Sequence, residues 1–534
     1  MNFRKTISLA LAALMGVSLF AGCGSKGGGS ANNSEIMSRE NVADYSYPEQ
    51  IELRIPVYDR GNAGQASVTD NYWTRYVQKN FGDKHNIKMT FVSIPRKEEN
   101  TAFNQLLAGK KENQPDIIFN YDYPTIVAFA DQGAFQKLDV EMIKKYAPTY
   151  YEKVKDLDKY TMVNGDRLFL SATRPQAYNF ITMVRKDWLD KCGLSVPKND
   201  DEYLNMLRAF RDKKLGGANT IPATSSLGNA YYPNYGFRPY PMPEKENALY
   251  SDLTVCALTY EPTKEQLKYD NALYNEGLIS PEWYLDTDGS KAREAFVSGR
   301  AGTYSDYLTK NPDVIGNLKK NVPDAEVVLL ASHPQDGKVP AGRQDNPFGM
   351  MSGINANCTH PEAVMMYFEW LAKPENLYVM QNGIKGVTFN EEDGVPVLVD
   401  GYSGEERLNY NSNKDMWCLV TEGKDLGSDE LNLKAQMKTY APAGYEFLIQ
   451  DSYDNYQKVK EYQYIDFIFN KPITTLSDMG ETLKSKWLKI KTDLINCSPD
   501  QFDALYESAC KEYLAAGYQQ VLDEKEKVYN EMKK

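Results

Sequence analysis

The feature that most constrains this chain is an alternation of strand and helix patterns near its N-terminal end. Apolar and polar side chains alternate in residues 51–57 and again in residues 87–91, which is the pattern of half-buried strands. Helical patterns fill residues 69–82 and 96–109, and residues 116–119 form a short apolar run. Strands and helices of these lengths in this order favour parallel strands in an α/β layer.

Two loops of this layer are the first candidates for a binding site. Ligands gather at the carboxyl ends of the strands in such sheets. Here those ends lead into residues 58–64 and residues 120–123. We therefore expect both loops on the binding side of the layer.

The later part of the chain contains further recognisable elements. Helical patterns cover residues 185–194 and 201–210, and the segment from about 453 to the end is mostly helical in pattern. Residues 387–399 predict a hairpin that turns at residues 391–394. In the first part of the chain, we expect Gly82 to end the helix that begins near residue 69.

The N-terminus carries the pattern of an export signal. Arg4 and Lys5 precede the uncharged residues 7–21, which are too few to span ~30 Å of hydrocarbon as a helix but suit a signal-peptide core. The stretch ends Leu19-Phe20-Ala21-Gly22-Cys23. This ending resembles the lipobox of bacterial lipoproteins, in which the cysteine is lipidated and becomes the mature N-terminus. An ordinary secretory signal that contains Cys23 by chance is the alternative.

Composition limits the possible partners of the mature chain. Residues 23–47 predict a flexible tether, since residues 24–33 are rich in Gly and Ser and carry Lys26 as their only charge. The formal net charge is −12 and no long basic block offsets it, so we expect no nucleic-acid partner. Six cysteines besides Cys23 lack any C-x-x-C spacing, which leaves their disulfide state open.

Three groups of short motifs follow one another along the chain. The first contains Asn164-Gly165-Asp166-Arg167-Leu168, Met183-Val184-Arg185-Lys186-Asp187-Trp188-Leu189 and Cys192-Gly193-Leu194. The second is Ala295-Phe296-Val297-Ser298-Gly299-Arg300-Ala301-Gly302-Thr303. The third contains Met351-Ser352-Gly353-Ile354-Asn355-Ala356, His360-Pro361-Glu362-Ala363 and Gly383-Ile384-Lys385-Gly386. Their order and spacing resemble extracellular solute-binding protein family 1, the sugar-binding lipoproteins of ABC importers that are related to maltose-binding proteins.

The resemblance implies an α/β fold of the periplasmic-binding-protein type II. In that fold two lobes are joined by hinge crossovers and the ligand lies in the cleft, and here a helical C-terminal region would follow. By analogy the crossovers lie near residues 174–179 and 348–353. The expected divisions are a signal peptide (1–22), a tether (23–47), a first lobe (48–174 and 349–388) and a second lobe (175–348 and 389–534).

The resemblance also implies a function. The chain would be anchored by a lipid on Cys23 at the outer face of the cell membrane, capture an oligosaccharide, and deliver it to the permease subunits of an ABC importer. No G-K-[S/T] sequence occurs, so the ATPase would be a separate chain. We expect a monomer without catalytic residues or cofactor. Many relatives carry a calcium-binding loop, but the matching residues 212–222 keep one carboxylate, so we expect no metal there.

Candidate ligand contacts follow from the chemistry of a neutral sugar. Hydroxyl groups surround its rim and C–H groups cover its faces, so recognition needs aromatic plates beside planar polar groups. The candidates are Tyr58, Asp59, Arg60, Tyr121, Asp122, Tyr123, Arg174, Tyr178, Tyr304, Asp306 and Tyr307. Structural roles are the alternative, with Arg174 bridging the hinge and the tyrosines packing loops.

Two other functions stay open at the level of sequence. A secreted glycoside hydrolase needs only two carboxylates ~5–9.5 Å apart, and the chain has 73 acidic residues. A receptor for peptides or another solute would share the same architecture, because a fold does not choose its ligand. Zinc-peptidase and serine-hydrolase chemistry are disfavoured, since neither H-E-x-x-H nor G-x-S-x-G occurs.

Overall fold

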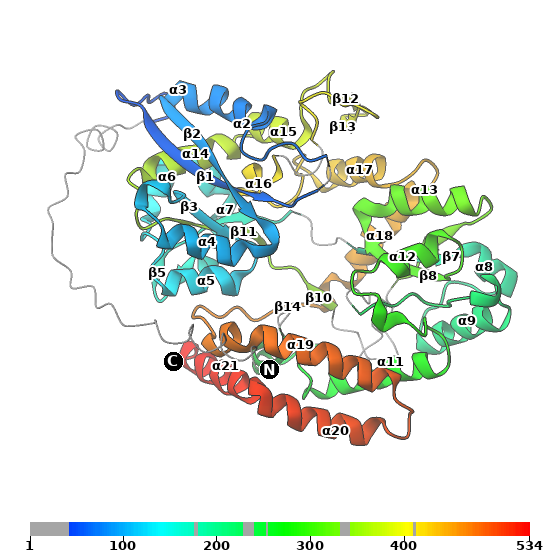
Figure 1. The fold of residues 1–534 in the computed structure, drawn as a ribbon. Helices are drawn as coiled ribbons and strands as arrows, with labels where there is room; N and C mark the ends of the chain where they lie inside the picture. Colours follow the sequence, from blue (N-terminus) through cyan, green and yellow to red (C-terminus); the bar gives the residue numbers. More distant parts are fainter. Residues whose placement is uncertain are drawn as a thin grey trace, which may run out of the picture.

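The computed structural model describes residues 42–62, 64–175, 180–227, 240–251, 255–331, 342–408 and 413–534. Within this part of the chain the elements gather into two lobes that lie side by side, with the C-terminal helices in a layer beneath them (Figure 1). No helix of the described residues is long and apolar enough to cross a membrane.

The first lobe begins with the predicted parallel strands. β1 (Ile51–Asp59) pairs in parallel with β2 (Ile87–Pro95), which confirms the pairing expected from the alternating pattern. β3 (Ile117–Asn120) lies beside β1, because the amide of Asp116 donates to the carbonyl oxygen of Arg54 at 2.9 Å. The carboxylate of Asp116 accepts in return from the amide of Arg54 at 2.7 Å. The loops after β1 and β3 therefore leave the same end of the lobe.

A later part of the sequence completes the first lobe. β11 (Phe348–Ile354) is buried along its whole length and pairs antiparallel with β3 and with β6 (Leu170–Thr173). Gly353 makes this packing possible, since a Cβ atom there would collide with the ring of Phe135. The helices of this lobe are α2 (Tyr72–Val77), α3 (Asp83–His85), α4 (Glu99–Ala108), α5 (Tyr123–Asp131), α6 (Val140–Tyr146), α7 (Pro148–Val154), α14 (Pro361–Ala372), α15 (Pro374–Asn382) and α16 (Lys414–Trp417).

The second lobe has a sheet and cores of its own. β7 (Phe180–Arg185) is the middle strand and pairs antiparallel with β8 (Thr303–Tyr307) and β9 (Val327–Leu329). Its apolar clusters draw on residues between Ile181 and Val528 and share none with the core of the first lobe. The helices around the sheet are α8 (Lys186–Cys192), α9 (Asp200–Asp212), α12 (Ser290–Val297), α13 (Asn311–Asn321), α17 (Asp429–Tyr440) and α18 (Glu446–Val459).

The C-terminal helices pack on the second lobe, and the last of them extend beneath the first (Figure 1). The side chain of Asn271 ties one of these helices to a helix from the middle of the chain, since its amide donates to the carbonyl oxygens of Leu494 and Cys497 at 2.9 and 2.8 Å. The C-terminal helices are α19 (Thr474–Asn496), α20 (Phe502–Tyr513) and α21 (Gln519–Met532), and two helices from the middle of the chain, α10 (Glu244–Tyr250) and α11 (Glu261–Asn275), pack against them.

The chain passes between the lobes after β6, before β11 and after Val420. On the way to β11, β10 (Gly342–Gln344) pairs in parallel with β14 (Gln463–Ile465). The second crossover was expected at residues 348–353, but those residues form β11 inside the first lobe, so the chain crosses before them. The core of the first lobe also extends to Val420 rather than ending near residue 388, because the residues around α16 are buried in it.

Local predictions were mostly confirmed, with one exception. The hairpin was predicted correctly as β12 (Phe389–Glu392) and β13 (Val395–Leu398). Gly82 does not end the first helix, which continues through α3 to Asn86, a residue in the left-handed conformation with φ of 56°. The segment after residue 453 is mostly helical, as predicted, with residues 463–473 extended or irregular between α18 and α19.

Candidate functional site

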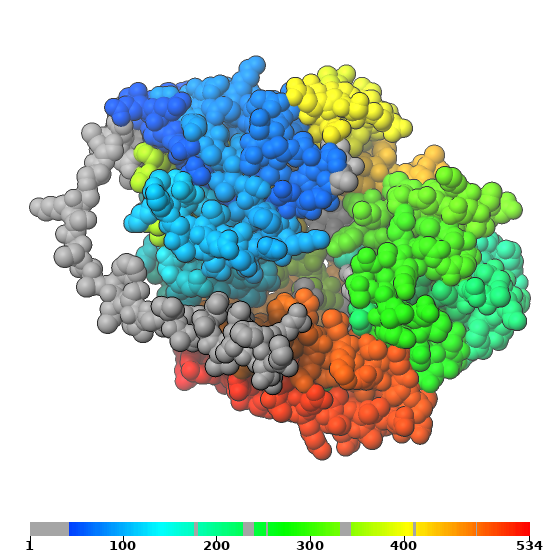
Figure 2. Space-filling view, in the orientation of Figure 1, coloured from blue at the N-terminus to red at the C-terminus, as the bar shows by residue number. Residues whose placement is uncertain are grey.

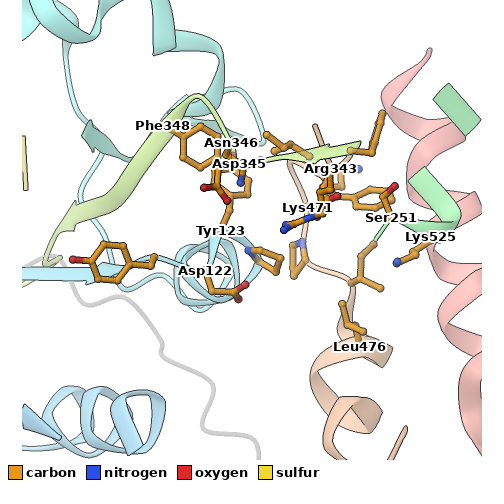
Figure 3. Close-up of a pocket in the computed structure, with 18 of the residues that line it drawn as sticks. Asp122, Tyr123, Ser251, Arg343, Asp345, Asn346, Phe348, Lys471, Leu476 and Lys525 are labelled. Carbon is orange, nitrogen blue, oxygen red and sulfur yellow. The ribbon is translucent and has the colours of Figure 1, made fainter. Parts of the chain in front are cut away.

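A cavity of about 230 Å³ lies where the crossovers meet the first lobe and the C-terminal helices. Its lining comes from residues 121–124 and Phe348 of the first lobe, from Arg174 and residues 343–346 of the crossovers, and from residues 466–476 before and within α19. Figure 2 shows the surface recess between the first and second lobes, and Figure 3 shows the residues that line the cavity. Segments far apart in the sequence therefore form one site.

The loop after β3 reaches this cavity. Asp122 caps α5 by accepting hydrogen bonds from the amide of Thr125 at 3.1 Å and its hydroxyl at 2.7 Å, and its side chain is exposed. Tyr123 is buried instead, with its ring packed on Phe348 and its hydroxyl donating to the carbonyl oxygen of Tyr160 at 3.0 Å. Asp122 is thus the member of this pair that is available to a ligand.

The loop after β1 is held inside the first lobe. Tyr58 is 1% exposed, donates its hydroxyl to Glu99 and lies under the guanidinium of Arg96 at 4.7 Å. Burial, followed by the charge of Glu99, raises the pKa of Tyr58. Asp59 is exposed and accepts from the amide of Gly61 at 2.9 Å. Neither Tyr58 nor Asp59 lines the cavity, and a ligand contact at either residue stays a prediction.

Arg60 and Tyr121 meet at a buried carboxylate. The guanidinium of Arg60 donates to both carboxylate oxygens of Asp415, at 2.6 and 2.9 Å. The hydroxyl of Tyr121 donates to the same carboxylate at 3.3 Å. Burial is the largest cause that raises the pKa of Tyr121, and the nearby Cys418 and Asp415 add to it. Arg60 therefore braces the loop, whereas Tyr121 also contributes to the cavity wall.

Arg174 joins the crossovers to one another. Its guanidinium donates to Glu422 at 2.5 Å and lies 3.5 Å from the carboxylate of Asp345. Main-chain hydrogen bonds hold the same segments together, since the amide of Glu422 donates to the carbonyl oxygen of Thr173 at 2.7 Å. Gly349 permits this approach, because a Cβ atom there would collide with the side chain of Glu422. Arg174 thus combines the bridging role with a place in the cavity wall.

The two candidate tyrosines of the second lobe, Tyr304 and Tyr307, differ in exposure. Tyr304 is buried, stacks on Phe296 at 5.4 Å and donates its hydroxyl to Asp306 at 2.8 Å. Tyr307 is 49% exposed and lies against Phe180, which is 42% exposed, with ring centroids 4.4 Å apart. Burial, then the charges of Asp345 and Asp306, raises the pKa of Tyr307. Tyr307 thus offers an exposed aromatic face on the second lobe, outside the lining of the cavity.

Phe180 was not among the sequence candidates; it begins β7 and pairs across the sheet with Tyr307, outside the cavity lining. Several wall residues were also missed. Arg343 and Asp466 form an ion pair at 2.7 Å, and Phe467 follows directly. The alternating aromatic and polar side chains around Asp466 were a strand signal within a region expected to be helical. Asn346 also lines the cavity.

Two predicted residues, Tyr178 and Cys23, lie outside the described residues. Among the described residues, no group of three or more His, Cys, Asp and Glu side chains is placed to hold a metal ion. No disulfide joins the cysteines in this part of the chain, which are Cys192, Cys256, Cys358, Cys418, Cys497 and Cys510.

Comparison with known proteins shows which family has this architecture. The model of the bacterial extracellular solute-binding proteins matches residues 65–377, which is more than half of the chain. The chain belongs to this solute-binding family. The family and the similar structures are binding proteins rather than enzymes.

Relatives of the family are similar at low identity. Lipoprotein LipO of Bacillus subtilis is 23% identical over 409 residues, which cover 73% of this chain and 74% of LipO. The polygalacturonan/rhamnogalacturonan-binding protein YtcQ of the same organism is 22% identical over 317 residues, which cover 57% of this chain and 62% of YtcQ.

Solved structures share the two-lobed fold over nearly the whole chain. The alginate-binding protein AlgQ2 has a TM-score of 0.60 at 16% identity, covering 91% of this chain and 99% of AlgQ2. An HMO-binding, ABC-transporter-associated solute-binding protein from Bifidobacterium longum infantis has a TM-score of 0.60 at 15% identity, covering 90% and 98%. These similarities show the two-lobed solute-binding fold that the sequence motifs predicted.

Proposed function

We propose that this solute-binding protein captures an oligosaccharide between its lobes and passes it, chemically unchanged, to the permease subunits of an ABC importer. The observation that carries the proposal is the cavity at the crossovers, where the rings of Phe348 and Phe467 lie beside Arg174, Asp345 and other polar groups. Aromatic faces suit the C–H patches of a sugar, and planar polar groups suit its hydroxyls. Similar proteins named for binding polygalacturonan, alginate and HMO support this ligand class.

Closure of the lobes would follow from contacts on both sides of the recess. Asp122 is exposed on the first lobe, and Phe180 and Tyr307 are exposed on the second. A ligand that touches both groups binds the closed arrangement more tightly than the open one, and so shifts the population toward it. The segments tied together by Arg174 are the natural hinge for this motion.

The proposal includes export and anchoring. The signal pattern and Cys23 support a lipid anchor on the outer face of the cell membrane, and a lipoprotein relative agrees with it. Two or more acyl chains hold a protein at a bilayer stably, whereas one chain is marginal. The variant Cys23→Ser, expressed in a bacterium that makes lipoproteins, should leave the membrane fraction and lose incorporated palmitate. A variant that stays in that fraction with its label would contradict the anchor.

A thermal-shift screen tests the ligand class. The full chain is mixed in parallel with neutral oligosaccharides, acidic oligosaccharides and short peptides, and the melting temperature is recorded. A ligand at 100 times its dissociation constant stabilises the folded state by ~2.7 kcal/mol, so a true ligand shifts the transition clearly. We expect shifts with glycans only. Shifts with peptides alone, or glycan fragments in the mixture after incubation, would refute the proposal in favour of a peptide receptor or a hydrolase.

A further inference from the structure

Most cationic side chains of the cavity wall pair with carboxylates of the protein. Arg174 pairs with Glu422 at 2.5 Å, and Arg343 pairs with Asp466 at 2.7 Å. Lys471 pairs with Glu531 at 2.9 Å. Lys525, the fourth, is buried and donates to the carbonyl oxygen of Leu249 at 3.4 Å. Three of the four charges are therefore neutralised within the protein, and the fourth lies on a buried side chain.

Hydrogen-bond acceptors, by contrast, are plentiful at the same wall. Asp122 is exposed, and the side chain of Asp345 is 36% exposed although it lies near Arg174. Among the described residues, Asn346 and Asp466 each have one buried side-chain oxygen that accepts no hydrogen bond. Figure 3 shows Asp345, Asn346 and Arg343 grouped on one side of the cavity, with Asp122 on the segment below them. Such a wall is best completed by a ligand that donates hydrogen bonds.

We propose that the cavity selects the neutral, hydroxyl-rich residues of an oligosaccharide and rejects uronate residues at the same position; this rests on the proposed function. A sugar hydroxyl donates to a carboxylate or amide oxygen and forms a charge-assisted hydrogen bond where the acceptor is ionised. A sugar carboxylate instead brings a second negative charge beside Asp122, Asp345 and Asp466, and like charges at short range repel. The chain would thus differ in specificity from the relatives named for polygalacturonan and alginate.

Two carboxylates are the specificity-determining residues of this scheme. Asp466 neutralises Arg343, and Asp345 lies 3.5 Å from the guanidinium of Arg174. Replacing Asp466 with Asn keeps the size of the side chain and removes its charge. Arg343 would then be left with an uncompensated charge and could pair with a sugar carboxylate in the bidentate manner that arginine favours. The variant Asp466→Asn should therefore gain affinity for acidic glycans while it loses affinity for neutral ones.

Isothermal titration calorimetry of the full chain in detergent tests this inference with matched ligands. The pairs share one backbone linkage and differ only at C6, such as galactotriose with trigalacturonate and mannotriose with trimannuronate. Across the pairs that bind, we expect the neutral member to bind at least about tenfold more tightly. We also expect its dissociation constant to change less than about twofold between 50 and 500 mM NaCl, since charge pairing contributes little.

Two variants distinguish an effect at the cavity from a general effect of removing one negative charge. Asp466→Asn should reduce the neutral-to-acidic preference at least about fivefold. Asp503→Asn removes an equal charge from the exposed surface of α20, where it pairs with Lys264 and Lys268, and should leave the preference unchanged. An acidic member that binds as tightly as its neutral partner, with salt-sensitive affinity, overturns this inference and leaves the proposed carbohydrate function standing. Binding of peptides without any glycan overturns both.

Discussion

Tyr307→Ala gives the sharpest prediction at the level of one side chain. Tyr307 is 49% exposed and lies beside Phe180 on the second lobe, where the proposed function assigns it a ligand contact. A covered aromatic side chain buries ~150–250 Å², so about 100 Å² of Tyr307 is open to a ligand. A sugar ring that covers half of this area removes ~50 Å² from water, which is worth ~1.3 kcal/mol at ~25 cal/mol per Å².

The predicted effect is therefore a rise in the dissociation constant of about 5–15-fold, with the melting temperature of the unliganded protein nearly unchanged because the side chain is exposed. Tyr307→Phe keeps the ring and should retain most of the affinity. Phe447 is 40% exposed on α18, and Phe447→Ala serves as the matched control. Calorimetry with the bound glycan gives both constants. Equal affinities for Tyr307→Ala and Phe447→Ala would refute the assignment of Tyr307 to the site.

Further predictions concern the framework of the site. Asp415→Ala should destabilise the first lobe by about 2–3 kcal/mol, because Asp415 is buried and its loss leaves the half-buried guanidinium of Arg60 without its carboxylate. Gly353→Ala should destabilise by about 1–3 kcal/mol or more, since the added methyl group collides with the ring of Phe135 inside β11. Burial lowers the pKa of Lys424 to about 8, so the folded state binds fewer protons than the unfolded state between about pH 8 and 10.5. Stability from this group therefore rises with pH across that window, and Lys424→Met should stabilise the chain by about 2–3 kcal/mol below pH 8, with the gain fading above about pH 10.

Thermal and urea unfolding of each variant beside the wild type measure these differences. An Asp415→Ala variant as stable as the wild type would show that the Arg60 pair contributes nothing. A Gly353→Ala variant without loss would mean that β11 shifts to accommodate the methyl group. A stabilisation by Lys424→Met that is equal at pH 7 and pH 10.5 would contradict burial of the ammonium group as its cause.

Local patterns in the sequence predicted many of the strands and helices of the fold. The alternation in residues 51–57 and 87–91 predicted β1 and β2 with their parallel pairing, because each strand buries one face in a way that a period of two reveals. The helix end at Asn86 was missed because Gly82 was expected to end the helix in a left-handed turn. Gly82 is not left-handed, and it is a glycine because neighbouring atoms pack closely against it. A glycine can serve either purpose, and only packing shows which one applies.

Sequence reasoning nominated some residues of the candidate site and missed those that come from distant segments. Asp122 and Arg174 were nominated and line the cavity, and their contact with a ligand stays a prediction. Arg343 and Asp466 form an ion pair because β10 pairs with β14. A local sequence pattern cannot predict a pairing between segments so far apart in the chain. Phe180 could have been noticed as an aromatic residue next to a predicted crossover, but its exposure depends on the register with β8.

Native mass spectrometry of the full chain, titrated with a panel of intact oligosaccharides and peptides, tests the central claim in one measurement. The account predicts a monomer that gains the mass of one intact glycan and releases that glycan unaltered after dissociation. A glycan recovered as fragments, or adducts formed with peptides alone, would contradict it.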